Sequence, residues 1–207
     1  MPAITHPGAV IHCWDHLVIT LRDELDGTET GFLSLYAITY SASLGAGHVA
    51  IVEIPAAGLV ATLADVPGLG ERQQARLVGM GDSHAALRLP PVEAAFERIP
   101  YGQDGFGFRI RTNHHRIEAR WEATVAPFWV DGQNGGFHDS EDIWALMVGA
   151  GRARLVVDGV ETAGAPFEDD AWTDKLGRTL SSAHGAFAEV RVQPVSPSGR
   201  AIGSERA

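Results

Sequence analysis

The chain has 207 residues, of which 45% are hydrophobic and 20% charged, a composition typical of an ordinary globular protein. Its formal net charge of −10 argues against electrostatically driven binding to nucleic acid or to an anionic membrane. Cys13 is the only cysteine, which excludes a disulfide within the chain, and no apolar run is long enough to span a bilayer. The first residues lack the pattern of a secretory signal, so the expected location is the cytoplasm.

Alternation of apolar and polar residues with a period of two dominates the chain and predicts strands. The expected strands are 11–21, 31–41, 48–54, 106–112, 114–125, 143–148, 152–158 and 184–192. Residues 71–80 are the best helix candidate, and the Pro90-Pro91 pair ends any continuation of that helix. Asp26-Gly27 and Asp158-Gly159 favour tight turns between strands.

Many short strands with frequent turn signals favour an all-β fold with one short helix. We predict an antiparallel barrel of the calycin or lipocalin type, with a β-sandwich as the alternative. No change of composition marks a linker between domains. Residues 8–193 are therefore expected to form a single domain between flexible ends at 1–7 and 194–207.

The segment from His12 to His16 carries the most informative cluster of the sequence. Residues two apart on a strand share a face, so His12, Trp14 and His16 point the same way. Neighbouring strands are expected to add further polar rings to this face, those of Tyr36, Tyr40 and His48. Because each ring brings a polar atom that needs a partner, the face suits the lining of a cavity inside the barrel. A solvated outer face is the other interpretation.

Two predicted loops, at 128–142 and 166–175, combine aromatic rings, glycines and carboxylates. At the mouth of a barrel such loops gate or read a ligand, and elsewhere they are solvated connections that supply negative charge. The first loop offers Trp129 as a ring that packs against a ligand and Asp139 as a candidate for proton transfer.

Metal and cofactor templates fit this chain poorly. His12 and His16 would lie ~13 Å apart on a strand, which is too far for both to bind one ion. No glycine-rich segment stands between a strand and a helix as dinucleotide binding requires, and the Gly-x-Ser-x-Gly motif is absent. We predict neither a metal nor a cofactor. Because the chain has nine histidines, a metal site assembled from distant positions is kept as an alternative.

Four features follow one another at the start of the chain: Trp14, the turn at Asp26-Gly27, a hydrophobic strand with Tyr36 and Tyr40, and Gly47-His48 at the next strand. In this order they resemble the opening of the lipocalin-like proteins grouped with hydroxyneurosporene synthase (carotenoid hydratase) and AttH. The chain departs from that family where Cys13-Trp14-Asp15 replaces its Trp-Trp-Tyr opening, and it is shorter than the usual two-barrel members. The resemblance implies a hydrophobic polyene or polyketide-like ligand and cofactor-free hydration, cyclisation or isomerisation.

The leading hypothesis is a barrel that binds a small, largely apolar molecule in its cavity and transforms it by acid/base chemistry without a cofactor, as a lyase or isomerase. The residues expected to carry the chemistry are His12, His16 and Asp139. Those expected to bind the ligand are Trp14, Tyr36, Tyr40, His48 and Trp129.

Two alternatives belong to other functional classes. One is a non-enzymatic ligand- or carbohydrate-binding module that uses Trp14, Trp121, Trp129 and Trp144 as stacking surfaces. The other is a metal-dependent enzyme built on scattered histidines. Neither nucleic acid nor membrane insertion is expected, and a homodimer formed through edge strands is compatible with the fold.

Overall fold

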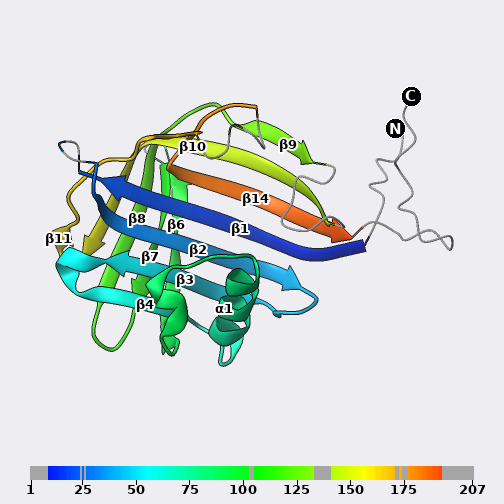
Figure 1. Ribbon diagram of the computed structural model, residues 1–207, viewed down its shortest axis with the longest axis horizontal. Helices are drawn as coiled ribbons and strands as arrows, with labels where there is room; N and C mark the ends of the chain where they lie inside the picture. The colour runs from blue at the N-terminus through cyan, green and yellow to red at the C-terminus, as the bar shows by residue number, and fades with distance from the viewer. Residues whose placement is uncertain are drawn as a thin grey trace.

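The computed structural model shows a barrel-like protein built mostly of strands, with one face covered by a helix (Figure 1). It describes residues 9–23, 25, 27–102, 105–132, 141–170, 173 and 177–192, and the side chains at 101, 131, 132, 141 and 142 are left aside. The predicted flexible ends at 1–7 and 194–207 lie outside these residues. The prediction of an all-β barrel is confirmed.

The helical segments are η1 (Pro55–Ala57), α1 (Leu69–Gly79) and η2 (Ala85–Arg88). The first strands are β1 (Ala9–Arg22), β2 (Glu29–Ser41), β3 (Gly47–Ile54), β4 (Leu59–Ala64), β5 (Val92–Glu93), β6 (Ala95–Gly102) and β7 (Gly105–Arg111). The others are β8 (Arg116–Thr124), β9 (Phe128–Gly132), β10 (Glu141–Val157), β11 (Val160–Glu161), β12 (Glu168–Asp169), β13 (Leu180–Ser181) and β14 (Ala183–Val192).

One 12-stranded sheet makes the barrel. Its path runs β5-β4-β3-β2-β1-β14-β10-β8-β7-β6, and β9 and β11 attach to β10. Its pairs are antiparallel apart from β4 and β5, which run parallel, so the sheet is mixed rather than purely antiparallel. The end strands β5 and β6 do not pair with each other in the described residues, and the barrel is nearly closed rather than closed.

The interior of the barrel lies between β1–β4 on one side and β6–β8 on the other, and it is filled by apolar side chains. Leu17, Leu35 and Phe108 are fully buried members of this inner cluster. Trp121 is also fully buried, stacks on Phe106, and donates its Nε1–H to a backbone carbonyl oxygen of β1 at 2.7 Å. The inner face is therefore a packed hydrophobic core.

Strand β10 is continuous, where two strands at 143–148 and 152–158 were expected. Its first half pairs with β14 and its second half with β8. The glycines between the two halves allow a bend at this corner, where an added Cβ on Gly149 would lie only 3.2 Å from Val125. These glycines therefore lie within one strand that passes from one side of the barrel to the other, and not in a turn between two strands.

Helix α1 covers the outer face of β3 and β4 (Figure 1). Its buried residues Leu69, Gln73 and Leu77 follow one another at intervals of four, which places them on one side of a helix. The helix expected at 71–80 is confirmed, with a start two positions earlier. No helix among the described residues has the length and apolar character needed to cross a membrane.

Strand β4 was not expected, because its sequence shows no alternation. Leu63 faces the inner core, while Ala64 packs in the cluster under α1 and Thr62 is fully buried. A strand covered on both faces needs few polar residues on either side, so the period of two disappears.

Candidate functional site

The face of histidines and aromatic rings lies on the outer side of the sheet. Trp14 and Tyr36 belong to the same buried cluster as Leu69 and Leu77 of α1. The other face of β1, with Leu17 and its aliphatic neighbours, fills the interior. The prediction that the polar rings line the inside of the barrel is therefore wrong, because the face of β1 that carries Leu17 packs the interior and the rings pack on the outer side.

The two histidines expected to move protons are tied into this outer cluster. The His12 ring stacks on Trp14 with 4.6 Å between ring centroids, and its Nδ1 forms a hydrogen bond with the Ser41 hydroxyl at 2.8 Å. The His16 ring stacks on a tyrosine at 4.1 Å, and its Nε2 forms a hydrogen bond with the Ser34 hydroxyl at 2.9 Å.

Both imidazoles are held in the neutral form. Burial, with a smaller effect of the Arg76 charge, lowers the pKa of His12 to about 4. Burial lowers the pKa of His16 to about 3, and His184 and Arg76 add to the shift. A base is most effective when its pKa lies near the working pH, so these two groups are poorly tuned for proton transfer near neutrality. Their contacts indicate a structural role.

The other predicted residues are not brought together. Burial raises the pKa of Tyr36 to about 12. Tyr40 is 48% exposed, because a bulge shifts the register and pairs it with Cys13 on the opposite face. Trp129 is 73% exposed, and Asp139 lies outside the described residues. Of the tryptophans of the carbohydrate-binding alternative, Trp14 and Trp121 are buried and offer no stacking surface.

His48 lies on the inner side of the sheet, at one end of the barrel. Its imidazole stacks on Phe96 of β6 at 5.2 Å and meets the edge of Phe108 of β7 at 5.9 Å. The His48 side chain is 32% exposed. The prediction that this histidine shares a face with Tyr36 is wrong, because the register of β2 and β3 pairs His48 with Ala37.

A carboxylate that the sequence did not single out holds this imidazole. His48 Nδ1 lies 2.6 Å from Asp65 Oδ2, and the backbone N–H of His48 donates to Asp65 Oδ1 at 2.7 Å. Nε2 makes no hydrogen bond with any described residue. The dyad therefore has the orientation of a general base, with one ring nitrogen bound to a carboxylate and the other directed away from it.

Gly47 makes this close approach of Asp65 to β3 feasible. Its φ of +142° lies in a region that favours glycine. An added Cβ would lie 2.7 Å from Asp65 Oδ1 and 2.8 Å from side-chain atoms of both Val66 and Leu69. The glycine leaves the space that the Asp65 carboxylate occupies beside the His48 N–H.

An ion pair lies near the dyad. Asp15 of β1 and His48 of β3 both pair with Ala37 of β2, which lies between them. Only the small side chain of Ala37 therefore separates Asp15 from His48 across these three strands. Arg98 of β6 forms an ion pair and a hydrogen bond with Asp15. The Arg98 guanidinium also lies 5.0 Å from the centre of the Phe108 ring, whose edge meets His48. A base and a cation therefore flank one apolar ring.

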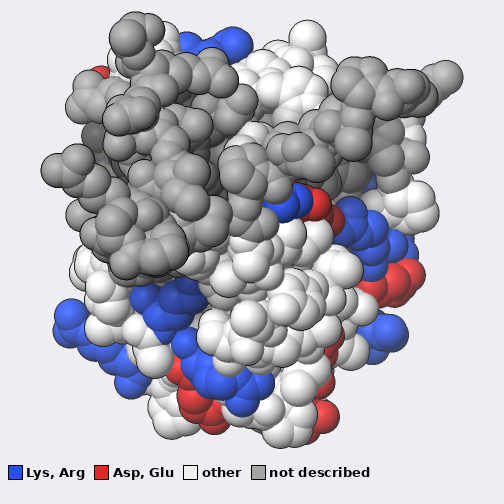
Figure 2. Space-filling model, turned by 90° about the vertical axis from the view of Figure 1, so that its right-hand side faces the viewer, with Lys and Arg blue, Asp and Glu red and all other residues white. Residues whose placement is uncertain are grey.

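The surface at the end of the molecule where β1 begins and β2 ends is seen in Figure 2. On this view, basic side chains lie in small groups beside acidic ones. Among the described residues, no group of three or more His, Cys, Asp or Glu side chains is placed to hold a metal ion.

A separate cavity of about 390 Å³ joins the described parts of both predicted loops. Phe128 lines it from the first loop and Phe167 from the second, with Arg178 and Ser181 beside them. No imidazole lies among the described residues of its wall, and these residues include neither His48 nor Asp65.

Asp65 and Arg98 are the residues that sequence reasoning missed. The signal for Asp65 was its position directly after the apolar run 59–64, which forms a hairpin with β3 and brings Asp65 back beside His48. Arg98 sits in a stretch with no clear period, and its ion pair depends on two strands from opposite sides of the barrel. Comparisons with protein-family models, with curated proteins and with solved structures gave no match to this chain.

Proposed function

We propose that the protein binds a small, largely apolar molecule at the barrel end beside His48 and transforms it by cofactor-free acid/base chemistry, such as hydration, cyclisation or isomerisation. One observation carries the proposal: an imidazole whose Nδ1 is held by Asp65 lies next to aromatic rings, and its Nε2 makes no hydrogen bond with a described residue. The cavity at Phe128 has no imidazole among the described residues that line it, which favours His48 as the place of the chemistry.

In the proposed reaction, neutral His48 accepts a proton from the substrate, or from a water that attacks it, at Nε2. The Nδ1–H remains hydrogen-bonded to Asp65, whose carboxylate stabilises the imidazolium formed. Arg98 is placed to stabilise negative charge on a substrate oxygen, because a guanidinium keeps several donors after pairing with Asp15. His48 then returns the proton to a different atom of the substrate or to solvent.

The substrate class follows from the surroundings of the base. Phe96 and Phe108 provide apolar rings beside the imidazole, and Arg98 and Asp15 provide one charged pair. This combination suits a largely apolar molecule with a carbonyl or carboxylate group. A cytoplasmic location is part of the proposal, and a chain with one cysteine agrees with a reducing compartment.

A nitrobenzisoxazole tests the base without knowledge of the natural substrate. A base removes its ring proton, the N–O bond breaks, and a coloured cyanonitrophenolate forms, while the proton passes to His48 and then to water. We expect His48→Gln to lower the protein-dependent rate about tenfold. A general base raises the rate of reaction of a well-placed substrate roughly 10²–10⁴-fold, and it raises the rate less for a probe that the site does not position. Asp65→Asn is expected to give a smaller loss in the same direction.

The chain offers a matched control for this experiment. His115 Nδ1 lies 2.8 Å from Asp158 Oδ2, and a backbone N–H donates to the same carboxylate, so this pair repeats the dyad with residues that take no part in the His48 site. His115→Gln should leave the probe rate unchanged. A wild-type rate in folded His48→Gln, or an equal loss in His115→Gln, would contradict the assignment of His48.

A further inference from the structure

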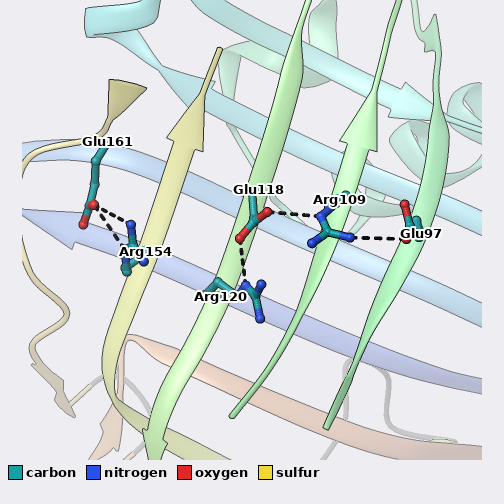
Figure 3. A network of polar contacts seen from close by, with 6 residues as sticks. All are labelled: Glu97, Arg109, Glu118, Arg120, Arg154 and Glu161. Carbon is teal, nitrogen blue, oxygen red and sulfur yellow. Dashed lines mark hydrogen bonds and ion pairs between the residues drawn. The ribbon is translucent and has the colours of Figure 1, made fainter. Parts of the chain in front are cut away.

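The outer face of β6, β7, β8 and β10 carries a network of arginines and glutamates (Figure 3). The pairs drawn are Arg109 with Glu97 at 3.3 Å, Arg109 with Glu118 at 3.2 Å, Arg120 with Glu118 at 2.9 Å and Arg154 with Glu161 at 2.9 Å. On the same face Arg152 pairs with Glu122 at 2.9 Å. Each of these arginines has a carboxylate partner.

Two arginines of this face are left out of the network. The side chains of Arg111 and Arg116 form no hydrogen bond or ion pair with any described residue. They are direct register partners across β7 and β8. Asp158, on the turn beside them, already accepts hydrogen bonds from the His115 ring and from the backbone N–H of Arg116.

Like charges directly opposite each other on neighbouring strands destabilise a sheet. Two positive charges without a carboxylate partner among the described residues are unexpected in a chain whose net charge is −10. Both arginines line a hollow of about 420 Å³, together with Arg109, Val156 and Gly159. Unpaired guanidinium groups that share one hollow lower their repulsion when an anion lies between them.

We infer that this hollow binds a doubly charged oxyanion, namely phosphate or the phosphate group of a small monoester, between Arg111 and Arg116. Guanidinium groups offer planar sets of donors that match phosphate oxygens, and two of them balance two negative charges. Glu97 and Glu118 also line the hollow, but Arg109 pairs with both and Arg120 also pairs with Glu118. Arg116 lowers the pKa of Asp158, mainly through the hydrogen bond from its backbone N–H and also through its charge. Neither Arg111 nor Arg116 forms an ion pair with a described carboxylate, so their guanidinium groups supply the positive charge for the anion. This site is separate from His48 and does not depend on the proposed reaction.

Titration of ¹⁵N-labelled protein with inorganic phosphate, at constant ionic strength, tests the site through the arginine Nε–H resonances. We expect a saturable shift of the Arg111 and Arg116 signals. Arg111→Gln and Arg116→Gln should each weaken phosphate binding at least tenfold. Since each change also removes a like charge, neither variant should melt at a lower temperature than the wild type when phosphate is absent.

Arg152→Gln is the control, because it removes one positive charge from the same face but leaves the opposed pair intact. Phosphate binding should be unchanged in this variant. A loss in Arg152→Gln as large as in Arg111→Gln would mean diffuse electrostatic attraction and would overturn the site. Signals of Arg111 and Arg116 that do not saturate with phosphate would overturn it as well.

Discussion

Acidification from about pH 6.5 to about pH 4.5 should lower the free energy of unfolding by about 4 kcal/mol, well before most carboxylates are protonated. The cause is the pair of neutral histidines on the outer face of β1. Their pKa values fall from 6.5 to about 4 for His12 and to about 3 for His16 in the folded protein. The unfolded chain binds protons at these histidines below its own pKa of 6.5, and the folded protein does not, so stability present above that pH is lost as the pH falls.

Urea denaturation at a series of pH values measures this loss. Each histidine contributes about 1.4 kcal/mol per pH unit between its unfolded and folded pKa values. His16→Gln, which keeps a group able to bond with the Ser34 hydroxyl, should therefore show a slope smaller by about that amount. His114→Gln removes an exposed histidine and should leave the slope unchanged. The same slope in His16→Gln as in the wild type would contradict the lowered pKa of His16 in the folded protein.

Gly47→Ala should destabilise the protein by about 3 kcal/mol or more, because it combines backbone strain with overpacking. The φ of +142° is unfavourable for alanine, and the added Cβ would lie 2.7 Å from Asp65 Oδ1. The variant should also lose probe activity, since the carboxylate that holds His48 must move to make room. Urea denaturation gives the first quantity, and the nitrobenzisoxazole rate gives the second.

Gly45→Ala separates strain from crowding. Gly45 has a φ of +88°, but nothing lies within 4 Å of an added Cβ. Its substitution should cost only about 1 kcal/mol, from the backbone conformation alone. Equal losses of stability in the two variants would show that contact with Asp65 does not constrain Gly47.

Much of the fold could be predicted from local patterns. Alternation located β1 and β8, because each has one face in the core and a different environment on the other, and the richness of 31–41 in aromatic and aliphatic residues located β2. Alternation does not say which face points inward. The prediction therefore placed the polar rings of β1 on the inner side of the sheet. They lie on the outer side, where Ser34, Ser41 and α1 supply the partners they need.

The candidate site depended on register, which a single sequence does not reveal. His48 was picked out as a ligand-binding residue, but its face follows from its pairing with Ala37. Its partner Asp65 is brought beside it by β4, a strand with no period of two. The pairing of Asp15 with Arg98 joins opposite sides of the barrel, and local sequence patterns carry no information about such contacts.

Chemical modification of the histidines tests the central assignment most directly. Diethyl pyrocarbonate reacts with accessible neutral imidazoles, and mass spectrometry of peptides gives the rate at each position. We expect His48 to react about as fast as His115, since their side chains are 32% and 30% exposed, and we expect the probe activity to disappear in step with His48. His12, which is buried, should stay protected in the folded protein. Activity lost in step with His12 or His16 while His48 stays unmodified would contradict the account.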